Sequence, residues 1–198
     1  MYDKILADAS LPSVLWALDR ELAAEVKARG CIHCHGPLDV ADYIRKPRCG
    51  PLELEEAHCR RLSLCCRREG CRRRTTPPSV RFLGRRVYLS VVVVLVGVLR
   101  QGPTPWRVAK LSQVLGVNRR TLVRWRHFWI VQLGGSRTFE LARADFMPPP
   151  ECAYLPRSLV ECFTGTATER VLRALSWLAA HFGSRFPKGG GGHAELAR

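Results

Sequence analysis

The sequence predicts a mainly α fold with a small β module of the zinc-ribbon type, a trihelical helix-turn-helix and C-terminal helices. Apolar residues recur at helical spacing near both ends of the chain. Seven of the nine cysteines lie between residues 31 and 71, and a twenty-residue segment further on fits a helix-turn-helix. These patterns divide the chain into an N-terminal helix (1–30), a Cys-rich module (31–80), a helix-turn-helix domain (81–135), a C-terminal helical segment (136–183) and a disordered tail (184–198).

Residues 13–29 are predicted to form the N-terminal helix. Apolar side chains recur every three or four residues, and Gly30 stands where a C-terminal glycine is common. Ser10 or Ser13 can cap the start. We expect the helix to pack against the module that follows and to expose a polar face made of Asp19, Arg20, Glu21, Glu25 and Lys27.

The Cys-rich module has few apolar runs, so hydrophobic burial alone cannot stabilise it. In Cys31-Ile-His-Cys34, two intervening residues let both thiolates reach one ion at about 2.3 Å. Cys66-Arg-Arg-Glu-Gly-Cys71 is a weaker second pair, in which Gly70 permits a tight turn. The predicted ligands of a structural Zn²⁺ are therefore Cys31, Cys34, Cys66 and Cys71.

Other interpretations of the module stay open at this stage. Spare thiols and imidazoles that can replace a ligand, and to which the sequence assigns no role, are Cys49, Cys59, Cys65, His33, His35 and His58. The cysteines can also act as small core hydrophobes. A catalytic zinc would need an open coordination position and a general base, and the surrounding arginines disfavour such a site at His35 and Glu69. The sequence thus predicts a protein that is not an enzyme.

The basic residues are concentrated in the middle of the chain. Residues 59–139 contain 18 Lys and Arg against one carboxylate, whereas the full chain has a net charge of +15. Arginine dominates, and its planar fork suits phosphate and guanine. This asymmetry favours a polyanionic partner, with a merely solvated basic face as the alternative. We expect the arginines between residues 60 and 86, Arg72, Arg73 and Arg74 among them, to contact phosphates.

Residues 108–127 fit the helix-turn-helix pattern. The first helix would place Leu111 and Leu115 inward and Ser112 at the crossing, and Gly116 and Val117 would form the turn. The second helix would be capped by Asn118, with Leu122 and Trp125 inward and an outward face of Arg119, Arg120, Thr121, Arg124 and His127. Such a helix meets base edges and phosphates at its N-terminal turns. The residues expected to contact DNA are Asn118, Arg119, Arg120, Thr121 and Arg124.

Two apolar features near this motif require an interpretation. The stretch 87–99 has 13 residues, fewer than the about 20 that cross a bilayer, so we expect a helix that supports the motif and no membrane partner. Aromatic residues at helical spacing are expected in the core, with base stacking as the alternative; they are Trp106, Trp125, Phe128 and Trp129.

The C-terminal segment is predicted to contain two short helices, 157–163 and 168–182, the second capped by Thr166 or Thr168. Residues 138–146 are expected to be extended, and Pro148–Pro150 to interrupt the chain. The two helices would either form a dimer contact or pack over the DNA-binding unit. Nine cysteines without a recognisable secretory signal favour a reducing, cytoplasmic location at the nucleoid.

The order of parts resembles the N-terminal DNA-binding region of bacterial insertion-sequence transposases that begin with a zinc ribbon, and stand-alone proteins associated with such elements. The resemblance covers roughly 31–130 and rests on the two cysteine pairs, the basic run Arg72–Ser79, the apolar helix and the helix-turn-helix. It implies binding of double-stranded DNA at element ends or an operator, with self-association or a transposase partner chain. A transposase also needs a nuclease domain, in which three carboxylates hold two metal ions. The chain after residue 130 is too short to form such a domain. The alternatives are the DNA-targeting subunit of a split transposase or nuclease, and an RNA-binding protein.

Overall fold

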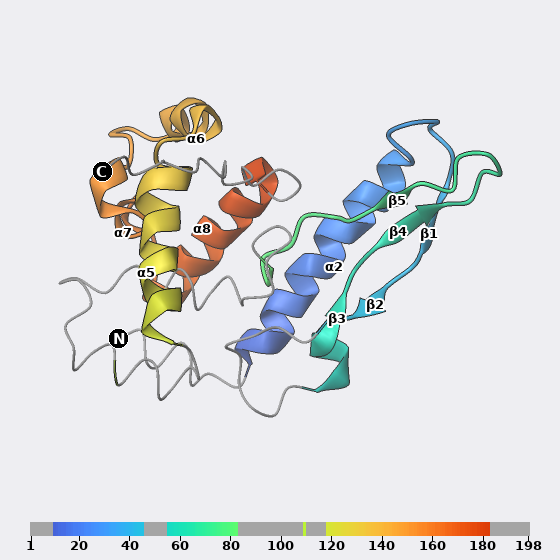
Figure 1. Ribbon diagram of the computed structural model, residues 1–198, viewed down its shortest axis with the longest axis horizontal. Coiled ribbons are helices and arrows are strands. Elements are labelled where there is room, and N and C mark those ends of the chain that lie inside the picture. Colours follow the sequence, from blue (N-terminus) through green and yellow to red (C-terminus); the bar gives the residue numbers. More distant parts are fainter. Residues whose placement is uncertain (1–9, 46–54, 83–108, 110–117, 183–198) are drawn as a thin grey trace, which may run out of the picture.

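The long helix α2 (Leu11–Arg29) lies between a group of helices and a small set of strands in the computed structural model, which describes residues 10–45, 55–82, 109 and 118–182 (Figure 1). Leu11 and Leu15 belong to the larger apolar core, and Val26 packs against the smaller one. The predicted N-terminal helix is confirmed and starts two residues early, after Ser10. Gly30 ends it with φ 76°, a conformation that glycine adopts without strain.

The strands form two antiparallel sheets. Their bounds are β1 (Leu38–Val40), β2 (Tyr43–Ile44), β3 (Arg60–Arg61), β4 (Leu64–Cys66) and β5 (Arg74–Thr75). One sheet has the order β1-β4-β5 and the other pairs β2 with β3. Leu38 lies opposite Cys66, and both are buried next to Val26 of α2, whereas Cys65 lies opposite Arg74 on the other face. The small β module is therefore confirmed.

The second half of the described chain is helical. Its elements are α5 (Arg119–His127), a π-helix (Phe128–Leu133), α6 (Arg137–Ala142), α7 (Arg157–Glu161) and α8 (Ala167–Phe182), with 3-10 turns at Arg143–Asp145 and Cys152–Tyr154. A further 3-10 turn, Glu56–Cys59, precedes β3 in the β module. The larger core joins these helices to the first turns of α2 and contains the fully buried Trp129 and Leu175. The mainly α class and the two C-terminal helices are thus confirmed.

Residues 138–146 are not extended, and that prediction was wrong. Ser136 starts α6 because its hydroxyl oxygen accepts a hydrogen bond from the Phe139 N–H at 3.2 Å. Phe139 and Ala142, three residues apart, then face the core. The start of α8 is set by a capping box, in which the Thr166 N–H donates to Glu169 at 2.7 Å and the Glu169 N–H donates to the Thr166 hydroxyl at 3.3 Å.

Several predictions fall outside the described residues. These are the first helix and turn of the helix-turn-helix, the apolar helix 87–99, Cys49, Trp106 and the tail 184–198. Of the predicted helix-turn-helix, the structure therefore describes the segment of the second helix, α5, and the motif as a whole stays a prediction. No helix in the described part of the chain is long and apolar enough to cross a membrane.

A buried ion pair joins α2 to the end of the β module. Asp19 is 0% exposed, and its carboxylate accepts hydrogen bonds from Arg81 Nε at 2.7 Å, the Ser79 hydroxyl at 2.6 Å and the Val80 N–H at 2.7 Å. The placement of Asp19 on the polar face of the helix was therefore wrong. All three of these hydrogen bonds come from the short segment Ser79–Arg81, which is thereby fixed against α2.

Two arginines of the basic block are core residues. Arg81 is 1% exposed and uses its two Nη atoms to donate to the carbonyl oxygens of His58 and Arg60, each at 2.7 Å. Arg61 is 2% exposed, donates to the Pro77 carbonyl oxygen at 2.7 Å and stacks over Phe82. The expectation that the arginines from 60 to 86 contact phosphates is therefore wrong for these two, because their guanidinium groups are inaccessible.

Candidate metal centre and basic surfaces

The four predicted ligands come together in one cluster. The Sγ atoms of Cys31, Cys34, Cys66 and Cys71 all lie within 4.8 Å of one another. A tetrahedral ion with bonds of 2.3 Å would hold its sulfurs about 3.8 Å apart. Sγ of Cys31 lies 3.8 Å from that of Cys71, and Sγ of Cys34 lies 3.4 Å from that of Cys66. The cysteines are thus positioned to hold a metal ion, and the donor set fits one.

The first pair of cysteines is shaped by a tight turn after α2. The Cys31 N–H donates to the Gly36 carbonyl at 2.9 Å, and the His35 N–H donates to the Cys31 carbonyl at 2.8 Å. A Cβ atom on Gly36 would lie 3.3 Å from Cys34 Sγ and 3.4 Å from Cys66 Sγ. Gly36 therefore allows the sulfurs to approach the backbone closely. This role of Gly36 was not predicted from the sequence, although a glycine two residues after a Cys-x-x-Cys pair is a usable signal.

The second pair connects strand β4 to the turn that follows. Cys66 is the last residue of β4, and the Cys71 N–H donates to the Arg68 carbonyl at 3.1 Å. Gly70 has φ 83°, so the predicted tight turn at this glycine is confirmed. Strand pairing with β1 places Cys66 opposite Leu38, four residues after Cys34, and so brings the two pairs together.

The surroundings of the sulfurs set their acidity. The pKa of Cys31 is lowered to about 7, chiefly because the backbone N–H of His33 stabilises the thiolate while burial opposes the shift. The pKa of Cys66 is raised to about 12, chiefly by burial. A metal ion binds thiolates, so it must displace the proton of Cys66 at neutral pH.

Metal affinity is therefore expected to rise with pH and to weaken as the pH falls below about 7, where Cys31 also becomes protonated. Competition titration with a chromogenic zinc chelator between pH 6 and pH 8 measures this trend. Calorimetry in two buffers of different ionisation enthalpy should detect proton release on binding. An affinity that did not change over this range would contradict ligation by thiols that are protonated in the metal-free protein.

The remaining thiols and imidazoles in the described part of the module lie outside the cluster. Cys65 points to the opposite face of β4, where its thiol donates to the Arg72 carbonyl at 3.5 Å. His33 Nδ1 lies 3.2 Å from Arg73 Nη1, and His58 lies 4.0 Å from Glu55. Cys66 and not Cys65 joins the cluster because side chains alternate along a strand, so neighbouring residues point to opposite faces of the sheet.

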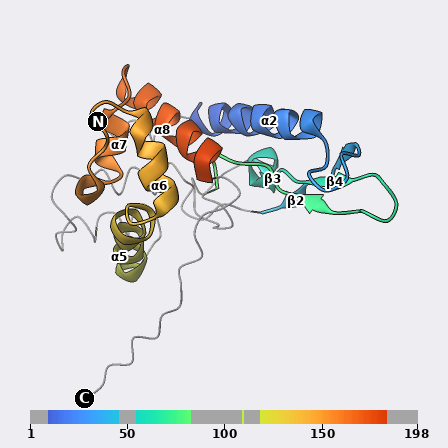
Figure 2. The ribbon, with the colours of Figure 1, turned by 90° about the horizontal axis from the view of Figure 1, so that it is seen from above.

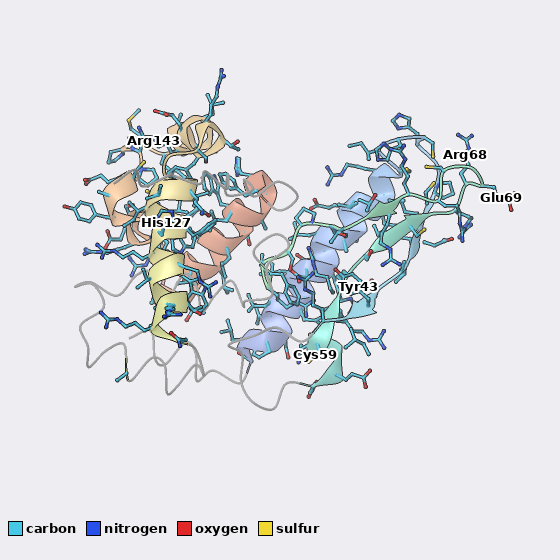
Figure 3. The ribbon with its side chains drawn as sticks, in the orientation of Figure 1. Tyr43, Cys59, Arg68, Glu69, His127 and Arg143 are labelled. Atoms are coloured by element: carbon cyan, nitrogen blue, oxygen red, sulfur yellow. The ribbon has the colours of Figure 1, made fainter. Side chains whose placement is uncertain are left out.

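A basic rim surrounds the cysteine cluster. We call it the knuckle rim and define it as Arg68, Arg72, Arg73 and Arg74, which are all exposed and share their turn with a single acid, Glu69. Arg68 Nη1 donates to the Cys34 carbonyl at 3.2 Å, and Arg74 lies over the Tyr43 ring at 6.0 Å. Figure 3 shows Arg68 and Glu69 at the end of the β module, beside sulfur atoms.

The neighbouring Arg67 does not add to the positive charge of the knuckle rim. It forms an exposed pair with Asp39, with Nη2 2.6 Å from Oδ1, and this hydrogen bond lowers the pKa of the Asp39 carboxyl. The four rim arginines have no such carboxylate partner among the described residues. They are therefore available to an external anion.

Helix α5 has the cap and the inward face that its sequence predicts. The Asn118 side-chain oxygen accepts a hydrogen bond from the Arg120 N–H at 2.9 Å, and Leu122 and Trp125 are buried. The outward placement of Thr121 was wrong, because it lies four residues before Trp125 on the same face and is 7% exposed. Its hydroxyl instead accepts a hydrogen bond from Arg124 Nη2 at 3.1 Å.

The opposite face of α5 is exposed and strongly basic. We define the α5 basic face as Arg119, Arg120, Arg124, Arg126 and His127. No described carboxylate forms an ion pair with any of these side chains. Figure 3 shows where His127 lies on this helix, within the group of C-terminal helices.

The aromatic residues near α5 lie in the core, as expected. Trp125, Phe128 and Trp129 are buried, and the last two meet edge to face with ring centroids 5.4 Å apart. Their rings are therefore inaccessible to nucleotide bases. The site thus consists of a cysteine cluster and two exposed basic surfaces, the knuckle rim and the α5 basic face. Comparisons of this chain with protein-family models, with curated proteins and with solved structures gave no match.

Proposed function

We propose that this chain is a DNA-binding protein that contacts duplex DNA through α5 and is stabilised by a structural zinc ion. The α5 basic face is the observation that carries this proposal. A helix held rigidly by Leu122 and Trp125 and capped by Asn118 presents several arginines and no carboxylate. Arg119 and Arg120 lie in its first turn, where a recognition helix meets base edges and phosphates.

The cysteine cluster supports a structural role for the ion. Four thiolates complete a tetrahedral shell, whereas a catalytic zinc keeps one position open for water or substrate. Among the described residues, the small core around the cluster contains only Leu38 and Leu64 as buried apolar residues besides the cysteines. Thiolate ligands and a tetrahedral arrangement are typical of Zn²⁺, which we propose as the natural ion.

We further propose that the chain acts without catalysis of its own. Glu140 pairs with Arg143, Glu161 with Arg157, and Asp145 with His181. In the part of the chain that the structure describes, the cysteine cluster is the only group of three or more side chains placed to hold an ion. We propose a mobile-element origin on the motifs that resemble insertion-sequence transposases.

Selection of bound duplexes from a random pool, with the zinc content measured on the same protein, tests the proposal. We expect an enriched duplex sequence, and Arg119→Ala should relax the preference at one position by a factor corresponding to about 1–3 kcal/mol. Arg73→Ala should instead weaken all duplexes alike and lower the slope of log affinity against log salt by about one. Arg157→Ala, which removes an equal charge from α7, is the control.

Three results would count against this proposal. Duplex binding that depends weakly on salt would exclude phosphate contacts as its main source. Stronger binding of structured RNA than of any duplex would favour an RNA-binding protein. Magnesium-dependent nicking by the purified protein would favour the DNA-targeting part of a nuclease.

A further inference from the structure

The two basic surfaces lie far apart along the molecule. The α5 basic face belongs to the helical group at one end of the long axis, and the knuckle rim lies at the other end (Figures 1 and 3). Helix α2 runs between them, and its 19 residues span about 28 Å at 1.5 Å per residue.

The elements that carry the two surfaces lie on the same side of α2 and α8. Figure 2 shows α5 and the strands on one side of α2 and α8. The inward residues Leu122 and Trp125 of α5 face the larger core, so its arginines point away from that core. In the β module, Cys66 and Leu64 pack toward Val26 of α2, whereas Arg74 and Cys65 lie on the opposite face of the sheet.

The spacing between the surfaces is held by buried contacts. Helix α2 contributes Leu11 and Leu15 to the larger core and Val26 to the smaller one. The Asp19–Arg81 pair at 2.7 Å fixes the end of the β module against the middle of the same helix. Rigid spacing matters because two surfaces bind one partner more tightly than either alone only when both can reach it at once.

We infer that the knuckle rim is a second phosphate-binding surface and that one DNA duplex lies across the rim and α5. This inference rests on the proposed function and adds the binding mode. The rim contributes exposed guanidinium groups, a donor type whose hydrogen bonds to phosphate oxygens are strong. The position of α5 and the strands on one side of α2 and α8 favours a single duplex over two duplexes bound at opposite ends.

Affinity for duplexes of increasing length tests this binding mode without knowledge of the target sequence. The probes are mixed-sequence duplexes of 8 to 26 base pairs, titrated at low salt with zinc-loaded full-length protein. We expect the affinity to rise about 100-fold as the duplex becomes long enough to reach both surfaces. A longer duplex also offers more positions at which the protein can bind, but this raises the affinity only gradually with length. One protein should bind one duplex above that length.

The variant Arg72→Gln/Arg73→Gln removes two rim charges and keeps an unbranched, polar side chain at each position. It should lose most of the rise in affinity with duplex length, because the rim can no longer hold the far end of a long duplex. Its zinc content shows whether the cluster is intact, and Arg68→Gln/Arg74→Gln is a second variant of the same surface. The control Arg20→Gln/Arg157→Gln removes two charges from α2 and α7, outside both surfaces, and should keep the rise.

The possible outcomes separate the two proposals. Short-duplex binding without a rise, or a rise that both rim variants retain, would overturn the second surface and leave recognition by α5 standing. Simultaneous binding of two long duplexes would overturn the single-duplex arrangement. A protein that bound no duplex of any length would overturn this inference together with the proposed function.

Discussion

The substitution Cys66→Ser is expected to unfold the β module, whereas Cys65→Ser should leave it folded. Cys66 is 0% exposed and lies within 4.8 Å of the other three sulfurs, whereas Cys65 lies on the opposite face of β4. Two leucines cannot replace the ion as the source of stability in so small a core. Zinc binding contributes about 10–16 kcal/mol in zinc-finger peptides, so its loss exceeds the usual stability of a domain.

The comparison of these neighbouring cysteines separates ligation from a general effect of losing a thiol. Zinc content measured by atomic emission should be about one ion per chain for the unmodified protein and for Cys65→Ser, and close to zero for Cys66→Ser. Limited proteolysis should then cut Cys66→Ser between residues 31 and 75. Equal zinc content in both variants would contradict the ligand set.

Chelation of the metal should disturb the β module much more than the helical group. None of the four ligands belongs to the larger core, which is built from α5 to α8 and the first turns of α2, with Val80 as its contact from the end of the β module. Far-ultraviolet circular dichroism should therefore retain most of its helical signal after zinc removal. Loss of all helical signal would show that the helical group depends on the β module.

The metal site was predictable because its signals are local. Each cysteine pair lies within a few residues, and Gly70 marks the turn of the second pair. The choice of Cys66 over Cys65 was weaker in sequence because it depends on the phase of β4, which strand pairing with β1 fixes. Gly36 was missed because its role arises from the approach of Cys66, thirty residues away in the chain.

Features that depend on distant residues were not predictable in this way. Asp19 has charged neighbours in sequence and looks like part of a solvated face, yet its partner Arg81 lies 62 residues away. Arginines 61 and 81 raise the count of basic residues without adding to the exposed charge. Thr121 was predicted to face outward because helical periodicity identifies the residues at the centre of a buried face more clearly than those at its edges.

The substitution Asp19→Ala is expected to destabilise the protein by about 3–5 kcal/mol, because it leaves the guanidinium of Arg81 buried without its carboxylate. The Ser79 hydroxyl and the Val80 N–H would lose an acceptor at the same time. Urea unfolding followed by tryptophan fluorescence measures the loss, since Arg81 stacks 4.4 Å from the Trp16 ring.

The matched control is Asp39→Ala, which removes the partner of the exposed Arg67. An exposed pair contributes little because water solvates both charges after the pair is broken, so this variant should unfold close to the unmodified protein. The double variant Asp19→Leu/Arg81→Met should recover part of the stability that Asp19→Ala loses, since no charge remains buried. The recovery should be partial because the His58 and Arg60 carbonyl oxygens would lose their donor. Equal effects of Asp19→Ala and Asp39→Ala would mean that the buried pair does not fasten α2 to the β module, and the fixed spacing of the two basic surfaces would lose its main support.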